Sequence, residues 1–548
     1  GSASDKNILG GKGANLAEMT ILGIPVPPGF TISTDVCTYF MQKGKYPADL
    51  TNEVENNLHQ IESIMGQTFG ESNNPLLVSV RSGARQSMPG MMETVLNIGL
   101  TSQTIPGLIQ KSGDERFVYD AYRRLITMYA DVVMEKAADI ESGEGEGIRE
   151  KLEALLENLK LKKKVKNDAD LDAEDLKCLC ENFKETIKTH LGQEFPDDPH
   201  TQLWGGVTAV FKSWNGKRAA HYRNIENIPS EWGTAVNIQA MVFGNMGEDC
   251  ATGVAFTRNP ATGENKFYGE WLPNAQGEDV VAGLRTPNPL NESSRIGGDE
   301  SLPTLENNMP TIYAELDAIQ QRLEIHYHDM QDIEFTIQNG RLWMLQTRIG
   351  KRNGAAAIRM AMEMLESGMI DEKTAIMRVN TGQLDEIMHP TLDADIEKGF
   401  SIMATGLPAG PGGASGQIVF TADDAESWHN NGKKVILVRK ETSPEDIHGM
   451  YASQAVLTAR GGMTSHAALV ARGWGKCCVV GCSEIQISAI EKTLSSNGTL
   501  LKEGDWITLN GSTGNVYEGE IPLKAADLQS NIFFKKLMEL ADKHRVMG

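Results

Sequence analysis

The feature that most constrains the fold is the alternation of short apolar runs and turns across residues 405–518. Runs such as Val435–Arg439 and Ala455–Thr458 have the length of buried strands, and glycine-rich or polar segments separate them. One intervening segment, which begins at His466, consists of small residues that favour a helix. Strands that alternate with helices in this way predict a β/α domain of ordinary size.

His466 stands in an unusual frame within this domain, the sequence GGMTSHAA at residues 461–468. The glycines allow a tight turn, and Thr464 or Ser465 is expected to cap a helix that begins at or just after the histidine. A helix N-terminus favours an anion, and imidazole is a competent nucleophile towards phosphorus. These residues predict that His466 carries a phosphoryl group. The alternative is an ordinary core or capping histidine.

A second candidate site lies within residues 331–348. Asp332 and Glu334 alternate with apolar neighbours, so both side chains are expected on one face of a strand. A turn signal at residues 339–340 predicts a hairpin that brings Gln346 back beside them. Oxygen ligands grouped in this way suit a hard cation that bridges phosphates. The alternative is an exposed, hydrophilic hairpin face.

Several stretches spread along the chain together resemble one family. Besides GGMTSHAA, they are LGGKGANLAEM (9–19), VSVRSGAR (78–85), MPGMM (88–92), GVAFTRNP (253–260), NAQGED (274–279), QDIEF (331–335) and LQTR (345–348). In combination they resemble the pyruvate, phosphate dikinases, a family of phosphoenolpyruvate-utilising enzymes, over essentially the whole chain. The related synthases usually have Cys in place of Ser465, and enzyme I of the sugar phosphotransferase system usually has Arg in place of Met463.

The resemblance implies an α/β (α+β) multidomain protein. Residues 1–350 are expected to form an ATP-grasp nucleotide-binding domain with a helical insertion at 101–200, and 351–404 a helical linker. Residues 405–518 are expected to form a swivelling β/α phosphohistidine domain. Residues 519–548 would lead toward a C-terminal (β/α)₈ barrel for pyruvate and phosphoenolpyruvate. Such a barrel needs about 250 residues, and only residues 519–548 follow the phosphohistidine domain. We therefore expect the barrel to be missing from this chain.

The resemblance also implies roles within the nucleotide-binding half. Lys12 and Arg81 are expected to hold ATP phosphates, and Arg348 to brace the transferring phosphoryl group. Glu334 and Gln346 are expected to ligate Mg²⁺. Further candidates near the nucleotide are Asp332, Arg123, Arg124, Arg258, Glu270 and Gln276.

Two smaller predictions complete the site. Residues 239–243 are expected to form a strand whose backbone bonds the adenine edge, with Met241 and Val242 as apolar cover; the alternative is a plain core strand. Thr464 resembles a threonine whose phosphorylation switches plant relatives off; the alternative is an ordinary helix cap. A phosphate on Thr464 would add roughly −1.5 to −2 charges close to His466.

The function implied is ATP + pyruvate + phosphate ⇌ AMP + phosphoenolpyruvate + diphosphate, through phosphohistidine at His466. Without the barrel, this chain is expected to carry only the ATP and phosphate half of the reaction. Two alternatives stay open. One is a phosphoenolpyruvate synthase, which uses water as the acceptor, and the other is a catalytically idle ATP-grasp interaction module.

Charge and cysteine content limit the partners and the location. A formal net charge of −21 argues against binding to nucleic acid or to an anionic membrane surface. Seven scattered cysteines predict reduced thiols and a cytoplasmic protein, with an organellar matrix or plastid as the alternative. The expected partners are ATP, inorganic phosphate and, through the barrel, pyruvate or phosphoenolpyruvate. The full-length protein is expected to be a homodimer.

Overall fold

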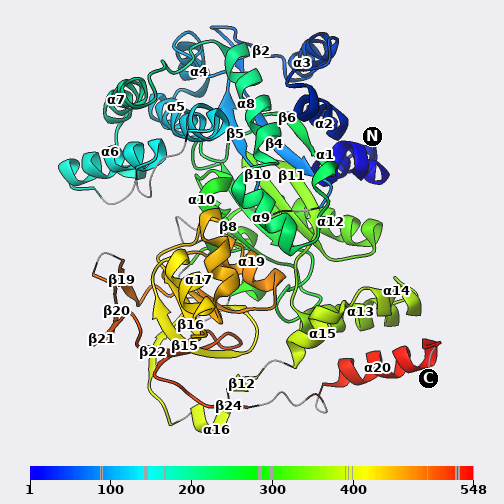
Figure 1. Cartoon of the computed structure of the whole chain (residues 1–548). Helices are drawn as coiled ribbons and strands as arrows, with labels where there is room; N and C mark the ends of the chain where they lie inside the picture. Colours follow the sequence, from blue (N-terminus) through cyan, green and yellow to red (C-terminus); the bar gives the residue numbers. More distant parts are fainter. Residues whose placement is uncertain are drawn as a thin grey trace. The chain divides into compact units, whose positions relative to one another are not determined.

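The structure is a computed structural model that describes residues 1–86, 88, 91–140, 146–165, 168–281, 287–295, 302–388, 390–392, 394–397, 399–489, 491–524, 528 and 531–546. It divides into two compact units (Figure 1). Unit 1 comprises Gly1–Glu248 with Trp343–Leu345, and unit 2 comprises Asp249–Leu342 with Gln346–Gly548. Two residues of the MPGMM stretch, Pro89 and Gly90, lie outside the described residues.

Unit 1 is built around an antiparallel sheet in the order β1-β6-β4-β5. Its strands are β1 (Gly29–Ile32), β6 (Thr234–Ala240), β4 (Val78–Ala84) and β5 (Thr94–Ile98). The helices that precede β4 are α1 (Lys6–Ile21), α2 (Thr34–Lys43) and α3 (Leu50–Met65), and the short strands β2 (Thr68–Phe69) and β3 (Pro75–Leu76) pair with each other. Helix α1 packs on β4 and β6, which brings its glycine-rich turn onto the sheet.

The predicted helical texture of residues 101–200 is confirmed. The helices are α4 (Ile105–Ser112), α5 (Glu115–Tyr129), the π-helical turn η2 (Ala130–Glu135), α6 (Ile148–Lys163) and α7 (Ala173–Leu191), followed by α8 (Pro199–Ser213) and α9 (Lys217–Ile225). Local capping explains where several begin: the side chains of Asp114, Asp172 and Asp198 each accept a hydrogen bond from a backbone N–H of the first turn.

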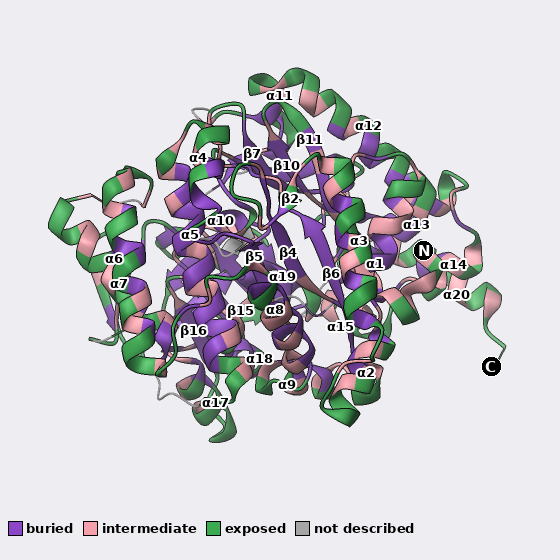
Figure 2. Ribbon diagram, turned by 90° about the horizontal axis from the view of Figure 1, so that it is seen from above, coloured by how far each residue is buried: buried purple, intermediate pink, exposed green. Residues whose placement is uncertain are grey.

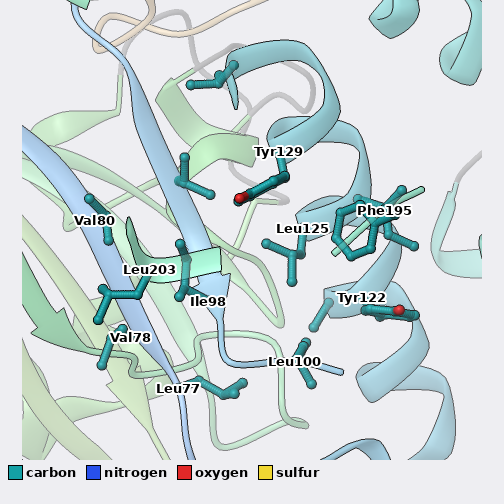
Figure 3. Close-up of a cluster of buried hydrophobic side chains, with 14 of the residues drawn as sticks. Leu77, Val78, Val80, Ile98, Leu100, Tyr122, Leu125, Tyr129, Phe195 and Leu203 are labelled. Atoms are coloured by element: carbon teal, nitrogen blue, oxygen red, sulfur yellow. The ribbon is translucent and has the colours of Figure 1, made fainter. Parts of the chain in front are cut away.

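The core of unit 1 joins these helices to the sheet. Figure 3 shows Val80 and Ile98 of the sheet beside Leu125 and Tyr129 of α5, with Leu203 of α8 among them. In Figure 2, β4 and β6 are buried, whereas α6 and α7 keep exposed outer faces. Burying such apolar side chains stabilises a fold by about 1.5–3 kcal/mol each, so this cluster gives the glycine-rich turn a rigid support.

A second sheet has the order β11-β10-β7-β8-β9 and belongs to unit 2 except for Trp343–Leu345 of β11. Its strands are β7 (Ala251–Phe256), β8 (Tyr268–Pro273), β9 (Asn288–Pro289), β10 (Gln331–Gln338) and β11 (Arg341–Ile349), and the long helix α12 (Pro310–Tyr327) precedes β10. The turn predicted at residues 339–340 is present, with positive φ at both Asn339 and Gly340. The hairpin therefore carries Asp332, Glu334, Gln346 and Arg348 as expected.

The β/α domain of unit 2 contains an eight-stranded sheet in the order β13-β23-β22-β15-β16-β17-β18-β14. The parallel centre is β15 (Gly413–Val419), β16 (Val435–Arg439), β17 (Ala455–Thr458) and β18 (Cys477–Val480); the other strands are β13 (Ile402–Thr405), β14 (Leu407–Gly410), β22 (Trp506–Asn510) and β23 (Asn515–Glu518). The accompanying helices are α17 (Ala422–Asn430), α18 (Ile447–Ala452) and α19 (His466–Gly473). The strands expected at 435–439 and 455–458 have the predicted bounds.

Residues 351–404 form more than a simple linker. Helices α13 (Gly354–Glu366), α14 (Glu372–Met377) and α15 (Thr381–Ile387) share a small core with α20 (Ile532–His544). The strands β12 (Thr391–Leu392) and β24 (Leu523–Lys524) pair beyond it. The remaining short elements are β19 (Gln486–Ser488), β20 (Thr493–Ser496), β21 (Thr499–Lys502), α10 (Gly277–Val281), α11 (Leu305–Asn308), α16 (Ala394–Glu397), η1 (Ala3–Asp5), η3 (Lys136–Ala138), η4 (Asp168–Asp170), η5 (Ser230–Trp232), η6 (Glu292–Ser294) and η7 (Pro444–Asp446).

All seven cysteines are free thiols, as their scatter in the sequence predicted. None of the helices in the described part of the chain combines the length and the apolar composition that crossing a bilayer requires.

Candidate functional site

His466 is the first residue of α19, and Ser465 occupies the N-cap position in an extended conformation. The side chain is 7% exposed, and its Nδ1 atom lies 3.0 Å from the Oγ1 atom of Thr442. Which of the two atoms donates depends on the ring tautomer. This contact fixes the orientation of the ring at the start of the helix, where backbone N–H groups and the helix dipole favour an anion.

Thr442 is a site residue that the sequence analysis missed. Strands β16 and β17 are parallel neighbours, paired up to Arg439 and Thr458. Thr442 follows the end of β16 and the His466 loop follows the end of β17. Because the carboxyl ends of parallel strands lie at one edge of a sheet, side chains that follow them meet there. The β/α pattern therefore contained the signal, although no local motif marks Thr442.

One face of the second sheet brings several candidate residues together. Asp332 lies opposite Phe256, which lies opposite Tyr268 on the next strand. In the adjacent row of the same face, Glu334 lies opposite Val254, and Val254 lies opposite Glu270. Paired residues point to the same side of a sheet. The predicted metal ligands of β10 therefore share a face with Glu270 of β8.

Glu270 binds the loop that carries His466. Its carboxylate accepts hydrogen bonds from the backbone N–H of Met463 (2.9 Å), and from the N–H (3.2 Å) and Oγ1 (2.7 Å) of Thr464. A Cβ atom on Gly462 would lie 2.5 Å from both carboxylate oxygens, so a larger residue there would displace the carboxylate from the loop. Glu270 is 6% exposed; burial raises its pKa, and the bonds from Thr464 and Met463 act against that rise.

The hairpin side chains pair in part with each other. The Nε atom of Arg348 donates to Asp332 Oδ2 at 2.7 Å, and Asp332 is 1% exposed. The other oxygen, Oδ1, is buried and has no hydrogen-bond partner among the described residues. Glu334 and Gln346 are half-buried on the same hairpin. The carboxylates of Asp332 and Glu334 and the amide oxygen of Gln346 suit a hard cation, and the buried Oδ1 of Asp332 has no other described partner. In the described ranges, no three His, Cys, Asp or Glu side chains form a metal-binding cluster by themselves.

Lys12 and Arg81 both belong to unit 1 and flank one close backbone contact. Helix α1 breaks at Gly10 (φ 67°, ψ 170°), and a Cβ atom there would lie 1.7 Å from the carbonyl oxygen of Gly83. Lys12 follows Gly10 on α1, and Arg81 precedes Gly83 on β4. The sequence predicted this pair of cations for phosphate binding, and the contact anchors both at the junction of α1 and β4.

The expected adenine-binding strand is wrong in its extent. Strand β6 ends at Ala240, and the N–H of Met241 donates to the carbonyl oxygen of Leu77 at 2.9 Å. The amide of Met241 is thus used within the fold, while Met241 and Val242 are half-buried after the strand. The apolar residues after Ala240 pack on the core of unit 1, although the strand has already ended.

Three of the weaker arginine candidates are held in ion pairs. Arg123 binds Asp120 (2.7 Å) and Asp168 (2.8 Å). Burial alone would raise the pKa of Asp120, but Arg123 and Arg124 beside it lower that pKa to about 2. The ion-pair contacts of the other two are Arg124 to Asp120, and Arg258 to Glu324 and Glu363. Gln276 is buried, and its backbone N–H donates to Asp279.

The fold is of the ATP-grasp type: two antiparallel sheets carry the glycine turn and the acidic hairpin, and a β/α domain follows in which His466 begins a helix. Residues 6–369 match the model of the pyruvate phosphate dikinase AMP/ATP-binding domain in overlapping segments, and residues 431–514 match the mobile domain of PEP-utilising enzymes. The chain belongs to the pyruvate phosphate dikinase AMP/ATP-binding domain family.

The relatives agree with these matches. The chain is 50% identical over 549 residues to pyruvate, phosphate dikinase of Rhizobium meliloti, covering 100% of this chain and 59% of the relative. It is 49% identical over 552 residues to the enzyme of that name from Clostridium symbiosum, covering 100% and 60%. It is 51% identical over 533 residues to the chloroplastic pyruvate, phosphate dikinase 1 of Zea mays, covering 97% and 54%. The chain thus spans little more than half the length of these curated relatives.

Proposed function

We propose that this chain carries the nucleotide half of the pyruvate, phosphate dikinase reaction. In that half, His466, ATP and inorganic phosphate give phospho-His466, AMP and diphosphate. The observation that carries the proposal is the binding of the His466 loop by Glu270, on the same sheet face as Asp332 and Glu334. The names of the relatives support it. In the whole protein, pyruvate would accept the phosphoryl group from His466 to give phosphoenolpyruvate.

The residues divide the work by chemistry. Thr442 holds Nδ1 of His466, which leaves the nucleophilic role to Nε2. The Nε2 lone pair forms a bond to the β-phosphorus of ATP while the P–O bond to AMP breaks, and inorganic phosphate then accepts the γ-phosphoryl group to give diphosphate. Lys12 and Arg81 would bind ATP phosphates, and Arg348 would brace the phosphoryl group. Glu334 and Gln346, with Asp332, would hold a divalent metal, for which we propose Mg²⁺. When bound, it would supply positive charge against the phosphate oxygens.

We also propose that the β/α domain moves. One histidine that collects a phosphoryl group at the nucleotide and delivers it to a separate pyruvate site must change position. The polar nature of the Glu270 contact and the match to a mobile domain support this proposal. For the full-length protein we propose a homodimer in the cytoplasm or, in a plant source, the plastid, without nucleic-acid or membrane partners.

Thr464 stays a proposed regulatory residue. Its hydroxyl is buried and donates to Glu270. A phosphate on Thr464 would remove that donor and set negative charge against the carboxylate, so the loop would be released from the sheet. Modification would require the loop to be away from Glu270.

The test is labelling from ATP that carries ³²P at the β- or the γ-position. We expect acid-labile label from the β-position in the wild-type chain, none in His466→Asn, and normal labelling in His429→Asn, an exposed histidine of the same domain. AMP release that needs no phosphate would favour a synthase. In the same assay Glu334→Gln should slow labelling, because it should remove several kcal/mol of transition-state stabilisation. Thr464→Glu should suppress labelling. Label that persists in His466→Asn contradicts the proposal.

A further inference from the structure

Arg472 is a buried cation with few bonds. It is 0% exposed, and it lies on α19, the helix that starts with His466. Its Nη2 atom donates to the carbonyl oxygen of Met463 at 2.9 Å. Its Nε and Nη1 atoms are buried and have no hydrogen-bond partner among the described residues. Burying a guanidinium with donors unused costs several kcal/mol, so a missing partner is expected.

The surroundings of Arg472 indicate what that partner is. The guanidinium carbon lies 5.9 Å from the ring centroid of Phe256, the residue directly opposite Asp332. Neighbouring strands are about 4.8 Å apart, so Arg472 lies above the strand next to the predicted metal ligands. Met463 connects the two sides of this arrangement, since its N–H binds Glu270 and its carbonyl binds Arg472.

The carboxylates of this face do not use the spare donors. Both oxygens of Glu270 accept bonds from the His466 loop, and one oxygen of Asp332 is bound to Arg348. The facing charged groups are therefore Glu270, Asp332, Glu334 and Arg348, with the buried Tyr268 hydroxyl in the row of Phe256. Asp332 Oδ1 also lacks a partner among the described residues, so one acceptor and two N–H donors are unused on this face. A phosphate group bound with its metal ion would satisfy both: its oxygens would accept from Arg472, and the metal would bind Asp332.

We propose that Arg472 donates its free N–H groups to non-bridging oxygens of the phosphoryl group that passes from the nucleotide to His466. The proposal rests on the proposed function and extends it. Arg472 forms no covalent bond: the N–P bond forms between His466 Nε2 and the β-phosphorus, and AMP departs with the electron pair of the broken P–O bond. Because Arg472 shares a helix with the nucleophile, this charge reaches the nucleotide only when the histidine does.

The experiment uses the whole chain in three variants. Arg472→Met should lower the rate of β-³²P transfer from ATP by about 100-fold or more, the usual effect of losing a transition-state donor. The transfer rate of Arg472→Lys should lie between those of Arg472→Met and the wild-type chain, because lysine keeps the charge without the planar pair of donors. Arg472→Ala should regain transfer when dilute guanidinium chloride or ethylguanidine is added. Arg460→Met removes an exposed cation just before the loop and should change nothing.

Two further readouts separate catalysis from support of the loop. Labelling of His466 by phosphoramidate, a small phosphoryl donor that needs no nucleotide, should also slow in Arg472→Met and should be restored by guanidinium in Arg472→Ala. The dissociation constant of Mg·ATP should be unchanged. The proposal is overturned if Arg472→Met transfers at the wild-type rate. It is equally overturned if transfer from ATP and transfer from phosphoramidate are both lost and guanidinium restores neither. That result would make Arg472 a positioning residue. Failure of the wild-type chain to label from ATP would instead overturn the proposed function.

Discussion

Two glycine-rich turns of this chain each allow a close approach to an oxygen atom, but the oxygen belongs to a different kind of group in each. At Gly10 in unit 1, a helix approaches the carbonyl oxygen of Gly83, where a Cβ atom would lie 1.7 Å away. At Gly462 in unit 2, a loop approaches the carboxylate of Glu270, where a Cβ atom would lie 2.5 Å away. The first contact is between two backbones, and the second is between a backbone and a charged side chain.

The difference matches what each turn is proposed to do. The Gly10 turn rests on a sheet supported by a large apolar core, so it holds Lys12 in one place. The loop before His466 is held through hydrogen bonds from Met463 and Thr464 to one carboxylate, which water can replace. A cation that binds phosphates benefits from a fixed position, whereas a carrier histidine must be released.

The largest effect is expected from Gly10→Ala. The methyl group meets a backbone oxygen and the φ of 67° is strained for alanine, so unit 1 should lose roughly 2–6 kcal/mol of stability. Gly23→Ala is the matched control, because Gly23 has φ 69° with no atom within 4 Å of the added methyl group. It should cost only about 1–2 kcal/mol. Urea unfolding measures both, and equal losses would show that the backbone contact at Gly10 is unimportant.

A smaller effect is expected from Glu270→Gln, which tests the second turn. The amide nitrogen cannot accept a hydrogen bond, so at least one bond to Met463 or Thr464 is lost, worth about 1.5–3 kcal/mol for a charged acceptor. Hydrogen exchange at the amides of residues 461–465 should rise while exchange in the core of unit 1 stays the same. Glu315→Gln, an exposed carboxylate of the same unit, is the control. Unchanged exchange in the loop would mean that Glu270 does not hold it.

The two turns also show what the sequence could predict. The start of α19 at His466 and the bounds of β16 and β17 agree with local signals, namely the glycines before the helix and the apolar runs, although the N-cap residue Ser465 makes no side-chain cap bond. The contact between Glu270 and Thr464 joins residues far apart in the chain, and no local pattern encodes it. A motif match also does not decide which partner a side chain takes.

Arg258 and Met241 illustrate that limit. Arg258 lies in a stretch that resembles the family, yet its guanidinium binds Glu324 and Glu363, because a buried cation takes the nearest carboxylates. Met241 continues an apolar run, yet its N–H turns to Leu77 after β6 has ended. Burial and hydrogen-bond competition decided both, and each depends on the tertiary fold.

The smallest effect is expected at the other end of α19, where a second carboxylate meets a glycine. Glu386 of α15 accepts a hydrogen bond from the N–H of Gly354 at 2.5 Å, and a Cβ atom on Gly475 would lie 2.1 Å from its Cγ. Burial raises the pKa of Glu386 to about 7, against the lowering effect of the Gly354 bond. Burial of Glu386 therefore outweighs the bond from Gly354 and favours the neutral acid, and burial also raises the pKa of Glu270 against the bonds from Thr464 and Met463.

The sign of the pH dependence follows from that rise. Because the pKa is higher in the folded than in the unfolded chain, the stabilisation is complete below the ordinary pKa of 4.5 and is lost as pH rises to about 7. Glu386→Gln keeps an oxygen for Gly354 and stays neutral, so it should match wild type at acid pH. Above neutral pH it should exceed wild type by about 1–2 kcal/mol, after allowance for partial exposure. Urea unfolding on both sides of neutrality gives the difference, with Asp385→Asn, an exposed neighbour, as control. If the difference in unfolding free energy between Glu386→Gln and wild type does not change with pH, the ionisation of Glu386 does not affect the stability of this contact.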